Sequence, residues 1–325
     1  MSEVQQKSGP RAGASKKMAE IFASINMNDL PAISDVVEEL IELTGNKFAT
    51  GDDLAESILK DYSLTTKILQ VANSAYYFRG VQITSVSRAV SLLGFNTIRE
   101  LATTIALIEE FIKAGVEERD ISKLLAQSYI SATFSKAFSL EKNLRISAEE
   151  AFLCAMLHNL GKIIIAVYLP ELFRDIEQKT LNGYTELQAT RMVLDGLTFA
   201  QVGQEIARFW NFSENIIETM IPSPPNIVDK NNMNAVLQHL AAFSNRLVGV
   251  ISTGSEEDLI RLVKYYEKVL PLSRDHIFEL LMKCVDMVED VSDTIKNGIA
   301  RLRFRSRIIS LHKNYLPNDT QQGAS

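Results

Sequence analysis

The sequence lacks several features that would mark a secreted, membrane-spanning or nucleic-acid-binding protein. Its two cysteines, Cys154 and Cys284, lie far apart and form no CxxC pair, so there is no disulfide framework, which fits a reducing compartment. No apolar run approaches the roughly 20 residues of a membrane span, and the polar N-terminus holds no apolar signal core. The formal net charge of −6 argues against a general nucleic-acid binder. We expect a cytoplasmic protein whose partners are neither membranes nor nucleic acids.

What the sequence does contain, from end to end, is helical periodicity. Apolar residues recur at three- and four-residue spacing, as in 31–43 and 233–251, and no alternating strand pattern bounded by a hairpin turn occurs. Further helices are expected at 256–270 and over a long stretch from 273 to about 312. Three capping boxes precede helices, at Ser147 with Glu150, Thr185 with Gln188, and Thr198 with Gln201. Together these patterns predict an all-α fold.

One stretch, Ala151–Lys162 (AFLCAMLHNLGK), is apolar on almost every face of a helix, which is typical of a helix in the middle of a protein. His158 and Asn159 nevertheless lie side by side within it. Polar groups in a buried helix need partners, because each one left without a hydrogen bond costs about 1–3 kcal/mol. We therefore expect Ala151–Leu160 to be among the most buried helices. The rest of the chain should supply partners or a ligand for the two polar side chains.

Five short stretches of the sequence share a pattern with one known family. They are Leu30-Pro31 ahead of Val36-Val37, Asp61-Tyr62-Ser63-Leu64, Ala72-Asn73-Ser74-Ala75-Tyr76-Tyr77, Ala89-Val90-Ser91-Leu92-Leu93-Gly94, and the stretch around His158-Asn159. In this pattern the chain resembles the HDOD family, a branch of the HD superfamily found in bacterial signalling proteins. Tyr62 stands where that family usually has proline. The resemblance implies an HD-like multi-helix bundle with a helical N-terminal lobe, followed here by extra C-terminal helices.

The resemblance and the composition of the two ends suggest a division of the chain. The predicted parts are a disordered tail (1–17), an HDOD domain (18–252) with an N-terminal lobe at about 18–115 and an HD-like lobe at about 116–252, a C-terminal helical extension (253–317) and a second tail (318–325). Both tails are polar, which is why no packed structure is expected for them.

The resemblance also locates the metal ligands of HD enzymes, which are a His, a His-Asp pair, sometimes further His residues and a final Asp. The matching positions, here called the relic HD positions, carry Gln127, His158, Asn159, Phe199 and Asn245. One imidazole and no carboxylate remain, whereas hard divalent cations need several oxygen ligands and zinc needs three or four N, S or O ligands. Without a metal there is no activated water and no charge clamp on a phosphate. We therefore expect no metal, no cofactor and no phosphohydrolase activity.

The two polar residues of the buried stretch have an ordinary structural explanation. His158 could still bind a ligand, but we favour a neutral, buried imidazole hydrogen-bonded to Gln127 or Asn245, because buried polar groups are normally satisfied within the protein. Asn159 has the shape of the lost Asp without its charge. Since an amide both donates and accepts hydrogen bonds, it suits a polar cluster without metal.

Two further features are candidates for contact with partners. The first is the neighbourhood of Asn73, Tyr76, Tyr77, Phe78 and Arg79, because Tyr, Phe and Arg are favoured at the energetic centres of interfaces. For Asn73–Tyr77 itself we favour a structural role, with Asn73 capping a helix and the tyrosines packing between lobes.

The second feature is the densest basic run, Arg301, Arg303, Arg305 and Arg307. Every-second spacing would place these side chains on two opposed faces of one helix. We therefore favour a solvated helix over a nucleic-acid or phosphate groove.

The function expected from these features is that of a non-catalytic signal-transduction module, acting as an adaptor or regulator that binds a protein partner. One alternative is a sensor that binds a nucleotide or another small ligand at the relic HD positions. Another is a metal-dependent phosphodiesterase with rearranged ligands, against which the missing carboxylates argue. Calorimetry with a nucleotide panel would separate the first two, and metal analysis with a phosphodiester substrate would test the third.

Overall fold

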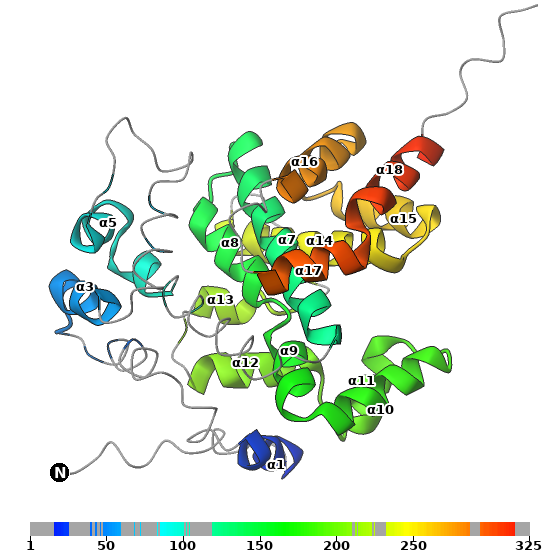
Figure 1. Ribbon diagram of the computed structural model, residues 1–325, viewed down its shortest axis with the longest axis horizontal. Coiled ribbons are helices and arrows are strands. Elements are labelled where there is room, and N and C mark those ends of the chain that lie inside the picture. The colour runs from blue at the N-terminus through cyan, green and yellow to red at the C-terminus, as the bar shows by residue number, and fades with distance from the viewer. Residues whose placement is uncertain are drawn as a thin grey trace, which may run out of the picture. The chain divides into compact units, whose positions relative to one another are not determined.

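Every regular element in the described part of the chain is an α-helix, and no strand occurs there, as the periodicity predicts (Figure 1). The computed structural model describes residues 16–25, 40, 43, 46, 48–59, 68, 72, 83, 85–100, 102, 104, 119–209, 212, 214–222, 224, 232–286 and 293–315. The chain forms two compact units: unit 1 comprises 1–116 and 160–217, and unit 2 comprises 117–159 and 218–325. This division differs from the predicted lobes, because part of the expected HD-like lobe belongs to unit 1.

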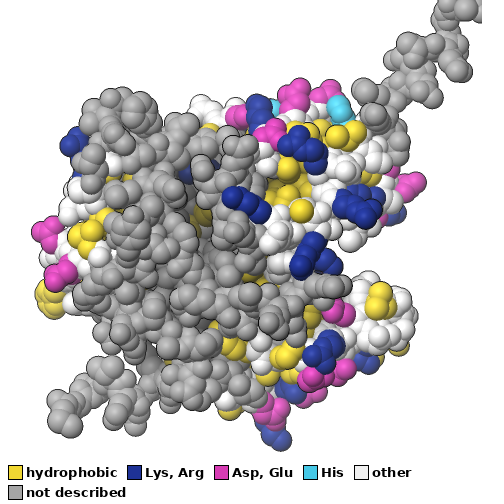
Figure 2. Space-filling view, in the orientation of Figure 1, with side chains coloured by type: hydrophobic (Ala, Val, Ile, Leu, Met, Phe, Trp, Pro, Cys, Tyr) yellow, Lys and Arg dark blue, Asp and Glu magenta, His cyan; other side chains and the backbone are white. Residues whose placement is uncertain are grey.

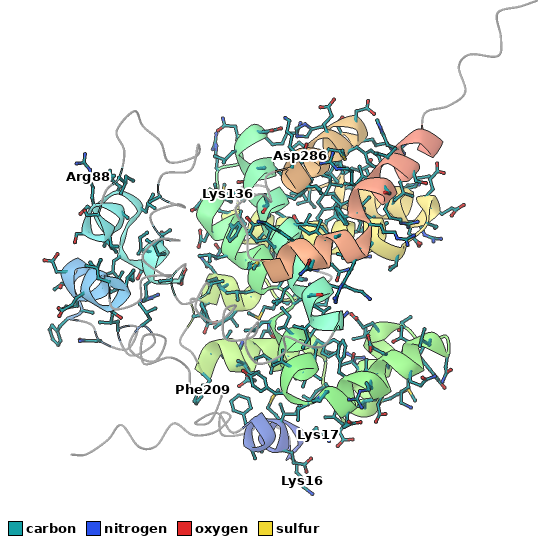
Figure 3. All side chains as sticks on the ribbon, in the orientation of Figure 1. Lys16, Lys17, Arg88, Lys136, Phe209 and Asp286 are labelled. Carbon is teal, nitrogen blue, oxygen red and sulfur yellow. The ribbon has the colours of Figure 1, made fainter. Side chains whose placement is uncertain are left out.

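Unit 1 combines N-terminal helices with helices from the middle of the chain. It contains α1 (Lys16–Ile25), α3 (Gly51–Leu59), α5 (Val86–Leu93), α9 (Leu160–Tyr168), α10 (Pro170–Leu181), α11 (Glu186–Val193), α12 (Phe199–Phe209) and most of α13 (Glu214–Glu218). α3 packs against α5, and α9 packs against α10 and α12. Phe209, labelled in Figure 3 at the end of α12, makes an edge contact with Phe22 of α1 at 6.0 Å between ring centroids.

The predicted capping boxes define where several helices begin. The Thr185 hydroxyl accepts from the backbone N–H of Gln188 while the Gln188 side chain accepts from the backbone N–H of Thr185, so α11 starts as predicted. Thr198 and Gln201 make the same reciprocal pair at the start of α12. Each box satisfies N–H groups that the first turn of a helix leaves without partners.

Gly161 allows α9 and α12 to approach closely within unit 1. A Cβ atom at this position would lie 2.0 Å from the carbonyl oxygen of Phe199 and 2.6 Å from the backbone nitrogen of Gly203. No side chain fits at such distances, so glycine is required for these two helices to pack as they do.

Unit 2 is organised around one long helix. It contains α7 (Arg119–Glu141), α8 (Ala148–Leu157), α14 (Met233–Thr253), α15 (Glu256–Tyr266), α16 (Arg274–Asp286), α17 (Asp293–Leu302) and α18 (Phe304–Tyr315). α7 packs against α8, α14, α16 and α17, and α18 packs against α14 and α16. The approach of α17 to α7 depends on Gly298, where a Cβ atom would lie 2.0 Å from the carbonyl oxygen of Ser122.

The C-terminal region corrects two expectations. The single long stretch predicted from 273 to about 312 is three helices, α16 to α18. Arg303 lies between α17 and α18 with a positive φ of 49°, which an α-helix cannot continue through, so the four arginines do not lie on one solvated helix. Arg301 donates to the Ser122 hydroxyl, and Arg305 forms an ion pair with Asp286.

Arg307 supports the end of another helix. Its Nε donates to the carbonyl oxygen of Ile251 at 3.0 Å, and its Nη2 donates to the carbonyl oxygen of Gly254 at 2.5 Å. These carbonyls lie at the C-terminal end of α14, where helical carbonyl groups lack intrahelical partners and a positive charge is favourable. Arg307 therefore joins α18 to α14 and stabilises the end of α14.

In the portion of the chain that is described, no single helix is long and apolar enough to cross a membrane. The pair Glu150–Leu157 and Leu160–Tyr168 meets the criteria of length and composition only as a bent combination.

Candidate functional site

The buried stretch predicted as one helix over Ala151–Lys162 is two helices. α8 ends at Leu157, α9 begins at Leu160, and His158 and Asn159 lie at the break instead of in the middle of a helix. The burial expected for 151–160 is confirmed, since only Phe152 and Asn159 are not fully buried there.

A bond to α14 accompanies this break. The carbonyl of Ala155, which in a continuing helix would accept from the N–H of residue 159, accepts instead from the side-chain Nδ2 of Asn245 at 2.9 Å. The Asn245 side chain of α14 thus donates to the carbonyl that a continuing α8 would use for its own backbone hydrogen bond.

His158 is buried and bonded, but not to the partners predicted for it. Its Nδ1 lies 2.7 Å from the carbonyl oxygen of Thr219, and since a carbonyl can only accept, Nδ1 carries the proton. Burial lowers the pKa of His158 to about 4, although the bond to Thr219 opposes this effect. The imidazole is therefore neutral at pH 7, as expected, whereas the predicted bond to Gln127 or Asn245 is wrong.

Asn159 and Asn245 form the centre of the site. Nδ2 of Asn159 donates to Oδ1 of Asn245 at 2.8 Å. Nδ2 of Asn245 in turn donates to two carbonyl oxygens, that of Ala155 at 2.9 Å and that of Ala241 at 3.0 Å. A carboxylate has no N–H to donate, so an aspartate at position 245 could not make these last two bonds. The geometry specifically uses the amide at this position.

The other two relic HD positions do not join this cluster through a hydrogen bond. Gln127 donates from Nε2 to the Ser252 hydroxyl at 3.2 Å, and Ser252 is seven residues beyond Asn245 on α14, about 10 Å along the helix axis. Phe199 belongs to unit 1.

In unit 1 the ring of Phe199 contacts other side chains. Its centroid lies 6.4 Å from that of Phe173 and 6.0 Å from Nζ of Lys162, which also pairs with Glu186. Phe199 therefore serves in local packing of α9, α10 and α12.

The residues around His158 do not fit a divalent metal ion. Nδ1 of His158 is protonated and donates to a carbonyl, and the Asn245 amide nitrogen faces two more carbonyls. Over the ranges that the structure describes, no group of three His, Cys, Asp or Glu side chains is placed to hold a metal. An amide pair bonded to itself and to the backbone supplies neither charge nor a convergent set of oxygen ligands.

The sequence did not reveal the partner of His158 or the partner of Gln127. Thr219 contributes a backbone carbonyl, which no side-chain pattern can identify, and Ser252 is an ordinary helical serine by sequence. The candidate interaction residues Asn73, Tyr76, Tyr77, Phe78 and Arg79 lie outside the described residues, so their role stays a prediction.

Comparison with known proteins identifies relatives of this chain. The HDOD domain family matches residues 30–222. An uncharacterized protein of Treponema pallidum (strain Nichols) is 23% identical over 212 residues, which cover 63% of this chain but only 39% of that relative. The chain therefore matches well under half the length of this relative.

Solved structures with a similar fold include two that cover most of the chain. An HDOD domain protein of unknown function from Geobacter sulfurreducens matches with a TM-score of 0.52 and 21% identity, covering 90% of this chain and 97% of that one. A candidate phosphohydrolase from Shewanella amazonensis SB2B matches with a TM-score of 0.58 and 19% identity, covering 87% of this chain and 98% of that one. At such identities the likeness shows the helical fold and does not extend to activity.

Proposed function

This chain belongs to the HDOD family, and from that premise we propose that it is a non-catalytic module of signal transduction that works by binding a protein partner. The signalling role rests on the family resemblance. The non-catalytic part of the proposal rests on the residues at the relic HD positions, and above all on Asn245.

Asn245 is the observation that carries the proposal. In an HD enzyme an aspartate at this position supplies negative charge to a metal. Here the side chain donates two hydrogen bonds to carbonyl oxygens of α8 and of its own helix, and accepts one from Asn159. A carboxylate in this orientation would face two carbonyl oxygens and repel both. The site is therefore suited to holding α8 and α14 together, and this role does not require a metal.

A nucleotide sensor at the relic HD positions has less support. Nδ1 of His158 and the side-chain atoms of Asn245 make their hydrogen bonds within the protein. A ligand there would have to break bonds whose loss costs about 1–3 kcal/mol for each group left without a partner. A titration of the full chain with a nucleotide panel, followed by calorimetry in wild type and in His158→Gln, tests this alternative.

A direct test of the non-catalytic proposal uses the purified full chain, as isolated and after incubation with Mn²⁺, Fe²⁺ or Zn²⁺. We expect no stoichiometric transition metal by elemental analysis and no hydrolysis of bis(p-nitrophenyl) phosphate. The matched comparison is His158→Gln, which removes the one remaining imidazole. The proposal is wrong if wild type binds one metal ion per chain and hydrolyses the substrate, and His158→Gln loses both. The protein would then be a phosphodiesterase.

A further inference from the structure

A groove of about 730 Å³ lies in unit 2 among the last turn of α16, α17 and the first turn of α18. Its lining includes three cationic side chains, Lys296, Arg303 and Arg305, and one carboxylate, Asp286, among the residues described there. Figure 2 shows Lys and Arg side chains around hydrophobic ones on the face formed by these helices. Asp286 is labelled in Figure 3 at the end of α16. This volume is within the usual range for small-molecule sites, which is about 300–1,000 Å³.

The charges of the groove favour an anion. Lys296, Arg303 and Arg305 are all exposed, and Arg305 pairs with Asp286. Within the described ranges no carboxylate pairs with Lys296 or Arg303, although the whole chain carries a net charge of −6. A guanidinium group matches the geometry of phosphate oxygens with two parallel N–H bonds, and a lysine adds a compact positive charge.

The tertiary structure is what brings these cations together. In one continuous helix, Lys296 and Arg303 would share a face because they are seven residues apart, and Arg305 would point to the opposite side. The positive φ of Arg303 separates α17 from α18, so side chains of both helices line one groove with the end of α16. The first turn of α18 holds no acidic residue that would compete with a bound anion.

The rest of the lining is suited to a small organic ligand. Val285, Ile299 and Ala300 form an apolar wall, and the Ser306 side chain lies in the first turn of α18. We propose that this groove binds the phosphate groups of a phosphate-bearing small molecule. The site uses helices other than α8 and α14, so it is independent of the relic HD positions and of the proposed lack of catalysis.

The test is calorimetric titration of the full chain with inorganic pyrophosphate and, separately, with ADP. The test variant is the double substitution Lys296→Gln with Arg303→Gln. The matched control is Arg261→Gln with Lys264→Gln, which removes one Arg and one Lys from exposed positions of α15 in the same unit. We expect saturable binding to wild type, at least tenfold weaker binding to the test variant, and a change of less than twofold in the control, with melts confirming that all three are folded.

Asp286→Asn gives an independent readout that does not depend on how the double variant folds. It removes the carboxylate that competes for Arg305, so we expect pyrophosphate to bind about threefold more tightly. If ADP binds more tightly than pyrophosphate, the apolar wall contacts the nucleoside. If the two bind equally, the site recognises phosphate alone. Both results support the proposal. Three results would overturn the proposal. They are absence of saturable binding to wild type, equal weakening in both double variants, and binding of a hexaglutamate peptide in place of pyrophosphate.

Discussion

Nδ2 of Asn159 donates a hydrogen bond to Oδ1 of Asn245 at 2.8 Å, across 86 positions of the sequence. Each amide here uses a capacity that a carboxylate lacks, since both donate. The pair couples the end of α8 to the middle of α14, and the second amide also holds the carbonyl of Ala155.

Asn245→Asp should destabilise the protein by about 2–3 kcal/mol, because two carbonyl oxygens lose their donor and face a carboxylate. Those carbonyls should raise the pKa of the new carboxyl above that in the unfolded chain. The folded protein is then more stable when the new carboxyl is protonated, at low pH, and loses this stability as pH rises. The loss of unfolding free energy caused by Asn245→Asp should therefore be larger at pH 7 than at pH 4. Urea unfolding at both pH values measures it. Asn297→Asp, at an exposed position of α17, is the control and should change stability by less than about 0.5 kcal/mol.

The neutral His158 should make the protein less stable in acid. Burial lowers the pKa of His158 from 6.5 to about 4, so between these values the unfolded chain binds a proton that the folded chain excludes. Stability therefore falls as pH drops from about 6.5 to about 4, by up to roughly 3 kcal/mol. His276, whose pKa is also lowered by burial, adds a smaller contribution of the same sign. The measurement is the difference in unfolding free energy between wild type and His158→Gln from pH 4 to pH 8; an unchanged slope in the variant would contradict the assignment.

His158→Ala should cost a few kcal/mol at pH 7, because it opens a cavity and leaves the buried carbonyl of Thr219 without its donor. His158→Gln should cost less, since its amide can still donate. A melting temperature unchanged in His158→Ala would mean that the imidazole contributes nothing to the packing of unit 2.

Gly161→Ala should destabilise the protein by at least about 2–3 kcal/mol, because a Cβ atom would overlap the backbone of α12. Gly249 of α14 provides the matched control, since a Cβ atom there meets nothing within 4 Å. Gly249→Ala should be neutral or stabilising by about 0.5–1 kcal/mol, as expected for alanine in a helix. Equal effects of the two substitutions in thermal melts would show that α9 and α12 are not held at this close distance.

Arg307→Ala should destabilise the protein by about 2 kcal/mol, because two carbonyls at the end of α14 lose a charged donor. Arg261→Ala is the control: its ion pair with Asp258 is exposed and should be worth less than about 0.5 kcal/mol. The comparison of the two variants by urea unfolding separates the helix-end contact from the general effect of removing an arginine. A cost for Arg307→Ala no larger than for Arg261→Ala would show that the two carbonyl contacts do not support α14.

The adaptor proposal predicts that partner capture depends on the candidate interaction residues, which include Phe78 and Arg79. Phe78→Ala with Arg79→Ala should weaken capture of the native partner in a pull-down while leaving the melting temperature intact. Gln127→Ala, if folded, should leave capture unchanged, because the Gln127 side-chain amide donates within unit 2, to the Ser252 hydroxyl. Loss of capture in Gln127→Ala, with no effect of Phe78→Ala with Arg79→Ala, would instead assign function to the relic HD positions.

Sequence alone is sufficient to predict the helical class, the capping boxes at Thr185 and Thr198, and the burial of the stretch around His158. Each of these depends on residues within about four positions of one another, so periodicity and side-chain chemistry are sufficient to predict them. The family resemblance likewise rests on short local motifs, and it assigns Asn159 and Asn245 to the relic HD positions.

Where these helices end, and what their polar groups bind, depends on contacts between segments that are distant in the sequence. The helix predicted through Lys162 breaks after Leu157, where a side chain from α14 takes the carbonyl of Ala155. His158 bonds the backbone carbonyl of a residue 61 positions away. Every residue has a backbone carbonyl, so no sequence pattern identifies this partner. Spacing alone predicts one helix for the basic run because it assumes continuity, whereas the left-handed Arg303 divides the run, and Arg307 of α18 contacts the end of α14. Local patterns specify helices, but the partners of buried and terminal groups are set by packing between segments distant in sequence.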